Sequence, residues 1–343
     1  MVPGQKVFGR KAIGRHGERL AQRRTAGNWT VRHRTCACIL PSGGPQAAPP
    51  PASSPLPITA PLLPTEALLA VLAGALLHAG WNTALKAGGG SASDAVLVVA
   101  GSAFIALLML PVVPAPSLAS APYLGVTAVL HVAYFRLLAA AYREGAMSHA
   151  YPLMRGTPPL LVALCSGVLL GEGLSAVAWA GTVLVCGGIL GLTLLGRRSG
   201  PSGSWRGTAC ALANALVIAA YTLVDGIGVR LSGSAAGYTL WGFLLLSVPM
   251  VGGALLRDAR GFLSHARRRW MVALAGGAAS IASYGLALWA MTLAPIAVVA
   301  ALRETSILFA MALAALVLRE RIGPVRLASG VVIVLGAASL RLA

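Results

Sequence analysis

Ten apolar runs of about 20 residues follow one another from residue 66 to the end of the chain, separated by short polar breaks. A helix of about 20 apolar residues spans the roughly 30 Å hydrocarbon core of a bilayer. The chain is 57% hydrophobic and 10% charged, whereas about a quarter of the residues of a soluble domain are charged. The sequence therefore predicts an all-α polytopic membrane protein with ten transmembrane helices, over residues 66–85, 94–113, 121–141, 146–170, 174–195, 207–229, 236–256, 270–291, 295–318 and 322–341.

Two ionisable residues, Arg303 and Glu304, lie inside the apolar run 294–320. A charged side chain at the centre of a spanning helix costs about 3 kcal/mol on insertion scales, so such residues face a bundle interior or a watered cavity. Neighbours at i and i+1 do not face each other on a helix. Each of the two therefore needs a partner elsewhere, and Asp225 or Glu304 is the expected partner for a buried arginine. A substrate role and a structural ion pair are both open at this point.

The run 145–172 repeats this arrangement, because Arg155 and Glu172 precede Arg303 and Glu320 by the same 148 residues. The chain is therefore interpreted as a duplication with five spans in each half. Since five is odd, the second half enters the membrane from the opposite side, which predicts two inverted repeats and a site near the midplane between them. The predicted parts are a tail (1–64), a first repeat (66–195), a linker loop (196–206) and a second repeat (207–343).

The net charge of +18 lies mainly in the tail and in short loops. The tail is Arg-rich and then rich in Pro and Ala, which predicts disorder; it is either a cytosolic extension that touches anionic lipid or a stretch included by a misassigned start site. The basic loops after the fifth, seventh and ninth helices favour the cytoplasm, which would put both termini outside. The basic tail argues for the reverse orientation. No nucleic acid partner is expected.

Polar residues line one face of the first helix of each half, at helical spacings of three and four. They are His78, Trp81 and Asn82 in the first half and Asn214, Tyr221, Thr222 and Asp225 in the second. Such faces form either a binding cavity or hydrogen bonds between helices. Further candidates for cavity walls or core packing are Tyr134, Arg136 and Tyr142 in the third helix and Tyr284 and Trp289 in the eighth.

Three prolines, Pro152, Pro158 and Pro159, surround Arg155 in the fourth helix. Each removes a hydrogen bond to the carbonyl group four residues earlier, and freed groups are tolerated only against protein or a watered cavity. The fourth helix is therefore expected to be broken, either to line the pathway or to improve packing. The ninth helix has no interior proline, so the two halves are expected to differ here.

Cofactors, metals and disulfides are not expected, because the five cysteines show no paired spacing. Recognisable catalytic motifs are also missing from the sequence, which argues against an enzyme. Gly187 and Gly191 in the fifth helix, and Gly330 and Gly336 in the tenth, are small residues that allow close helix packing. A homodimer face at these glycines is the weaker alternative.

The segments HAGWN in the first helix, YPLMRGTPPLL followed by LLGE, and ALRETSILFA followed by LRER resemble the EamA-like branch of the drug/metabolite transporter superfamily. The resemblance covers residues 66–343. It implies inverted repeats, alternating access without ATP, cytoplasmic termini and a central cavity walled by helices 1, 3, 4, 6, 8 and 9. The cavity candidates are then His78, Trp81, Asn82, Tyr151, Arg155, Tyr221, Asp225, Tyr284, Trp289, Arg303 and Glu304.

The functional hypothesis is a multi-pass secondary transporter in the cytoplasmic (inner) membrane that moves a small anionic or zwitterionic metabolite, such as an amino acid or organic acid. Arg155 and Arg303 would hold the negative group, because fixed positive charges in a low-dielectric cavity favour an anion. A coupling proton or cation would be sensed by Glu304, Asp225 or His78. The alternatives are a membrane-embedded transferase that acts on a lipid-linked substrate and a scaffold that transports nothing.

Overall fold

The structure is a computed structural model that describes residues 63–88, 91–144, 147–195, 204–317, 319 and 322–343. The predicted tail up to residue 62 and the linker residues 196–203 lie outside these ranges. The described elements are helices α1 (Thr65–Ala87), α2 (Ala92–Met109), η1 (Leu118–Ser120), α3 (Ala121–Glu144), α4 (Met147–Gly156), α5 (Pro158–Leu170), α6 (Ala176–Leu195), α7 (Trp205–Ser232), α8 (Ala235–Arg268), α9 (Trp270–Leu293), α10 (Ile296–Arg303), α11 (Ser306–Val317) and α12 (Pro324–Leu342).

The all-α membrane fold is confirmed within the described ranges. Eight helical segments there are long and apolar enough to span a membrane, and two shorter apolar helices lie where the second and fifth spans are predicted. Large apolar side chains point away from the protein interior, among them Leu256, Val168 and Leu316, which are 91%, 86% and 78% exposed. Such a surface suits lipid rather than water. The helix α8 continues beyond the predicted end at residue 256, because helical backbone resumes after a kink at Asp258.

The helices of the two halves pack against each other in reciprocal pairs. The helix α3 of the first half packs on α7 of the second, and α9 of the second half packs on α1 of the first. Exchanging the halves turns one of these contacts into the other, and it maps the α6–α12 and α2–α8 contacts onto themselves. This pattern agrees with the predicted duplication. The inverted orientation in a membrane stays a prediction.

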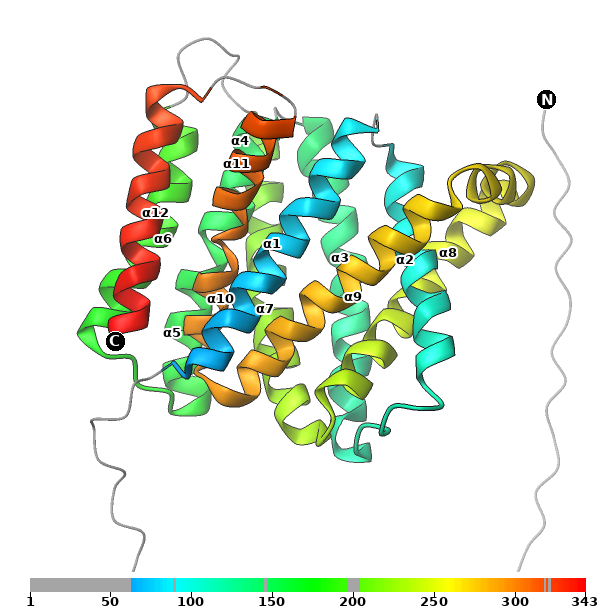
Figure 1. Ribbon diagram of the computed structural model, residues 1–343, viewed down its shortest axis with the longest axis horizontal. Coiled ribbons are helices and arrows are strands. Elements are labelled where there is room, and N and C mark those ends of the chain that lie inside the picture. Colours follow the sequence, from blue (N-terminus) through cyan, green and yellow to red (C-terminus); the bar gives the residue numbers. More distant parts are fainter. Residues whose placement is uncertain (1–62, 89–90, 145–146, 196–203, 318, 320–321) are drawn as a thin grey trace, which may run out of the picture. The chain divides into compact units, whose positions relative to one another are not determined.

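The fourth and ninth spans are both interrupted, at positions separated by 148 residues. One helix ends at Gly156 and resumes at Pro158, and the other ends at Arg303 and resumes at Ser306. In Figure 1 the chain descends from α4 to α5 but rises from α10 to α11, so the two interrupted spans run in opposite directions. The expectation that only the first half has a broken helix is therefore wrong.

The second interruption forms without proline. The N–H of Glu304 donates to Ala301 O at 3.1 Å, and the N–H of Thr305 donates to Leu302 O at 3.0 Å. These bonds join residues three apart, so the chain makes a 3₁₀ turn in place of the α-helical ladder. The Thr305 hydroxyl also donates to Leu302 O at 2.7 Å, which stabilises the tighter turn.

An ion pair connects the two halves at one end of the bundle. Glu172, in the turn between α5 and α6, accepts from Arg230 of α7 at 2.6 Å. Its second oxygen accepts from the N–H of Ile296 at 3.0 Å, so a carboxylate lies at the positive N-terminus of α10. Arg230 also donates to the carbonyl oxygens of Met291 and Ala294 at 2.7 and 2.9 Å.

A second set of charges connects the halves at the opposite end. Asp94, at the start of α2, is 1% exposed. One of its oxygens lies 3.0 Å from His265 Nε2 and 3.2 Å from Arg269 Nε. Asp94 also completes a capping box with Ser91 at the N-terminus of α2. Contacts between the halves therefore hold both ends of the bundle.

Candidate functional site

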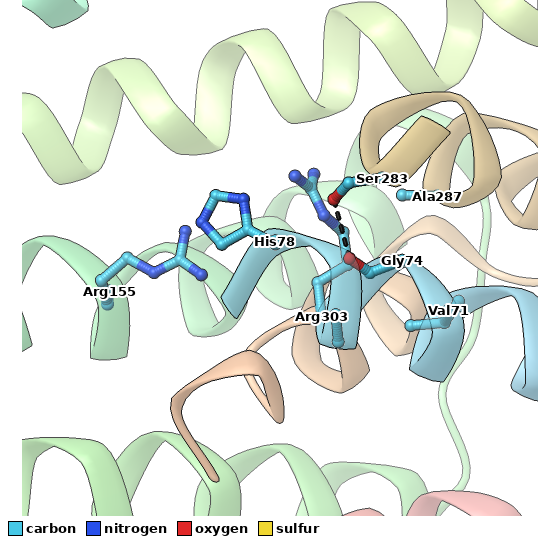
Figure 2. Close-up of a pocket in the computed structure, with 8 residues that line it drawn as sticks. Val71, Gly74, His78, Arg155, Ser283, Ala287 and Arg303 are labelled. Carbon is cyan, nitrogen blue, oxygen red and sulfur yellow. Dashed lines mark hydrogen bonds between the residues drawn. The ribbon is translucent and has the colours of Figure 1, made fainter. Parts of the chain in front are cut away.

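A small polar pocket lies among α1, α4, α9 and α10. It is lined by Val71, Gly74, Ala75, His78, Arg155, Ser283, Ala287 and Arg303. Figure 2 shows the side chains of His78, Arg155 and Arg303 reaching toward the same space from three different elements. The cavity volume is about 10 Å³, which holds about one water molecule. A metabolite can enter this pocket only after the surrounding helices separate.

The first arginine of the pocket, Arg155, is already paired. Its Nε lies 3.0 Å from Glu304 Oε2, and the two side chains are 17% and 9% exposed. Its Nη2 donates to the Ser306 hydroxyl at 3.1 Å. Glu304 was one of the two partners expected for a buried arginine, and this pairing is confirmed. The Nε–Oε2 contact lacks hydrogen-bond alignment, so charge attraction carries it.

The second arginine, Arg303, has an aromatic neighbour instead of a carboxylate. Its guanidinium carbon lies 5.0 Å from the centre of the Tyr284 ring, within the range of a cation–π interaction. No ion pair involves Arg303 in the described ranges. Arg303 is therefore the cation of the pocket whose charge has no anionic partner there.

Beside the pocket, Asp225 is buried in a cage of tyrosines. Its side chain is 1% exposed, and its two oxygens accept hydrogen bonds from Tyr238, at 3.0 Å, and from Tyr284. The cage is closed by His131 of α3, whose ring stacks on Tyr221 with centroids 4.4 Å apart and meets the Tyr284 ring edge-on. Tyr284 thus joins the cage to Arg303 of the pocket.

The predicted residues of the first helix separate in the structure. The His78 ring lines the pocket and meets the Trp81 ring edge-on, with centroids 5.7 Å apart. Trp81 Nε1 is buried and has no hydrogen-bond partner in the described part of the chain. Asn82 is exposed and donates to His78 O at 2.7 Å, within its own helix.

Two other predicted aromatic residues lie away from the pocket lining. Tyr151 is 36% exposed and Trp289 is 40% exposed, and neither lines the pocket. On α7, Asn214 and Thr222 use their hydrogen bonds structurally, Asn214 toward Met154 at 3.1 Å and Thr222 toward its own helix. Their role as site residues stays a prediction.

Four residues near the site were not singled out from the sequence: His131, Tyr238, Ser283 and Ser306. His131 had a readable signal, because Thr127, His131 and Tyr134 recur at helical spacing on one face of α3. Ser283 donates to Gly74 O at 2.8 Å and joins α9 to α1 at the wall of the pocket. Tyr238 and Ser306 carry no pattern of this kind.

Comparisons with known proteins agree with this fold. Residues 205–342 match the EamA-like transporter family. A solved structure described as "Crystal structure of protein" is 19% identical to this chain and has a TM-score of 0.61, over 80% of this chain and 96% of that one. At this identity the likeness shows the fold alone. No curated protein matches the sequence.

Fold and site together define the class: a multi-pass membrane protein, all-helical over the described residues, with ionisable residues around a small interior pocket. More specifically, the chain carries an EamA-like transporter family domain at residues 205–342, as expected for the drug/metabolite transporter superfamily. The family resemblance drawn from the sequence is confirmed for residues 205–342.

Proposed function

We propose that the protein is a secondary transporter of a small anionic or zwitterionic metabolite, such as an amino acid or organic acid, in the cytoplasmic membrane. The observation that carries the proposal is the difference between the two arginines of the pocket. Arg155 is neutralised by Glu304, whereas Arg303 contacts an aromatic ring and lines the pocket. Arg303 is partly buried, and an unpaired charge away from water is costly, so a carboxylate or other anionic group of the substrate would lower that cost.

In the sequence-based hypothesis both Arg155 and Arg303 held the anion, whereas here Arg303 alone holds it. One available arginine suits a substrate with one negative group in this pocket. The unpartnered Trp81 N–H lies next to His78 and offers a hydrogen-bond donor to a second polar group. The small residues Gly74, Ala75 and Ala287 of the wall leave room for the body of the substrate once the pocket opens.

Alternating access would require each end of the bundle to open in turn. The Glu172–Arg230 contact holds one end, and the Asp94 contacts to His265 and Arg269 hold the other. Both sets join the first half to the second, so each can release while the other persists. The interruptions of the fourth and ninth spans lie between these two ends and supply the hinge for such a movement.

The proposal is tested by thermal unfolding of the purified protein with amino acids, organic acids, phosphonates, nucleosides and amines. A ligand at about 100 times its Kd adds about 2.7 kcal/mol of stability. We expect anionic or zwitterionic ligands to stabilise the wild type and Arg257→Ala, a control at an exposed arginine of α8, but not Arg303→Ala. Hits that are only cationic, or that survive Arg303→Ala, would overturn the anion assignment.

Transport is then measured by uptake of a stabilising ligand into proteoliposomes. We expect uptake without ATP that is lost in Arg303→Ala. Binding without uptake would contradict the transporter assignment. A product formed from a lipid-linked donor, detected by mass spectrometry, would support the transferase alternative instead.

A further inference from the structure

Tyr284 connects the available cation of the pocket with a buried acid. Its ring lies under the Arg303 guanidinium, and its hydroxyl group donates to the Asp225 carboxylate. Asp225 has no basic side chain within ion-pair distance in the part of the chain that the structure describes. The acid and the cation are therefore separated by the width of one tyrosine side chain.

Charges around the pocket lie close to one another. Arg155 is balanced by Glu304 in direct contact, whereas Arg303 and Asp225 contact two parts of one side chain, the ring and the hydroxyl group of Tyr284. If an anion binds Arg303, its negative charge cancels the positive charge that the guanidinium presents to Asp225 across Tyr284. A buried charge without a counterion is expensive, so Asp225 then gains by accepting a proton. Protonation of Asp225 in turn strengthens anion binding at Arg303, because linkage between two binding sites is reciprocal.

We propose that Asp225 is a proton-binding site coupled through Tyr284 to the Arg303 pocket, so that one proton binds together with each anionic substrate. The proton comes from water and adds to one oxygen of the Asp225 carboxylate, with no change in oxidation state. Tyr284 stays in hydrogen-bond contact, because a phenolic hydroxyl group can accept as well as donate. This inference rests on the proposed function, in which the pocket takes an anion.

A proton fits this site better than a metal ion. Both Asp225 oxygens are already in contact with tyrosine hydroxyl groups, and no cluster of three or more His, Cys, Asp or Glu side chains suited to a metal occurs among the described residues. Hard cations such as Ca²⁺ and Mg²⁺ need about six or more oxygen ligands. A proton needs one oxygen atom.

The other titratable groups around Asp225 come from each helix packed near it. They are His131 of α3, Tyr238 of α8, Tyr284 of α9, Tyr221 of α7 itself and Arg303 of α10. His131 is the competing proton acceptor. Its Nδ1 donates to Thr127 O at 2.8 Å, because a carbonyl oxygen can only accept, so Nε2 is the nitrogen left to take a proton.

The test follows the infrared band of a protonated carboxylic acid as the pH of the purified, ligand-free protein is varied. Asp225→Asn identifies the band by its loss. Arg303→Gln imitates neutralisation of the cation by an anion, and Arg303→Lys preserves the charge. We expect the Asp225 band in Arg303→Gln to form at a pH about one unit higher than in the wild type, the order of effect expected between nearby unit charges. In Arg303→Lys it should form close to the wild-type pH.

Two tyrosine variants test whether Tyr284 couples Asp225 to Arg303 or only packs between them. Tyr284→Phe keeps the ring under Arg303 but removes the hydroxyl contact to Asp225, whereas Tyr238→Phe removes the other hydroxyl contact, which does not involve Arg303. We expect the difference between wild-type and Arg303→Gln titrations to shrink in the Tyr284→Phe background and to persist in Tyr238→Phe. If the difference between these titrations is the same in Tyr284→Phe and in Tyr238→Phe, Tyr284 does not couple Asp225 to Arg303.

The proposal is wrong if the band survives Asp225→Asn, if it is lost instead in Glu304→Gln, or if it forms at the same pH in Arg303→Gln as in the wild type. Loss of the pH response in His131→Gln with a normal Asp225 band would assign the proton to His131 instead. Because no ligand is used, these outcomes stand apart from the ligand screen, whose failure would affect only the proposed substrate.

Discussion

The pairing of Arg155 with Glu304 predicts a strongly non-additive effect on stability. At 3.0 Å and an effective dielectric constant of about 20, two unit charges attract by about 5 kcal/mol, before desolvation is subtracted. Removing one partner of a buried pair costs about 3–5 kcal/mol, because the other charge stays buried and unpaired. Arg155→Gln and Glu304→Gln should each lose stability of this order, and Arg155→Gln also loses its bond to Ser306.

The double variant Arg155→Gln/Glu304→Gln should be no less stable than either single variant. The non-additivity is then at least about 3 kcal/mol, at or above the upper end for residues in contact. The assay is equilibrium unfolding in mixed detergent micelles. Glu66→Gln, an acid-to-amide change at an exposed position, should stay within about 0.5 kcal/mol of the wild type. Additive losses in the double variant would refute the pairing and return Arg155 to the list of substrate contacts.

Two further stability predictions follow from particular contacts. Gly188→Ala should loosen the α6–α12 interface, because its Cβ would lie 2.7 Å from Ile333, whereas Gly187→Ala meets nothing within 4 Å and should be neutral or raise the melting temperature through better helix propensity. Glu172→Gln should lower stability by about 1–3 kcal/mol, because the N-terminus of α10 at Ile296 loses a charged acceptor; a melting temperature equal to that of the wild type would contradict this role.

Much of the fold could be predicted from the sequence, because apolar runs of membrane-spanning length leave few alternatives. The same reasoning named Glu304 as one of two candidate partners for a buried arginine, since a charge inside such a run requires a countercharge. Among the glycines expected to pack helices closely, Gly336 does so, with a virtual Cβ 2.7 Å from Gly181 O, but Gly187 faces open space. At the α6–α12 interface the close contact is made instead by the next residue, Gly188.

The interruption in the ninth span could not be predicted from prolines, because residues 296–317 contain none. Arg303 and Glu304 are adjacent but have partners in different directions, Tyr284 and Arg155. Residues at i and i+1 point in different directions on a helix, so the spacing predicts two separate partners. Only the three-dimensional arrangement identifies them.

Only part of the Asp225 cage could be predicted from the sequence. The spacing of Tyr221 and Asp225 marks one face of α7, but the hydrogen-bond partners of Asp225, Tyr238 and Tyr284, come from α8 and α9. Sequence periodicity identifies a polar face without identifying what packs against it. For the same reason Trp289, a good candidate from its residue type, is 40% exposed on the outer side of its helix.

The central claim is that the positive charge of Arg303 selects an anion. The most direct measurement compares thermal stabilisation by acetate and by acetamide, a charged and a neutral probe of nearly the same shape, in the wild type, Arg303→Lys and Arg303→Gln. The account predicts stabilisation by acetate over acetamide in the wild type, a smaller preference in Arg303→Lys and none in Arg303→Gln. Equal effects of the two probes on the wild type, or an acetate preference that persists in Arg303→Gln, would contradict it.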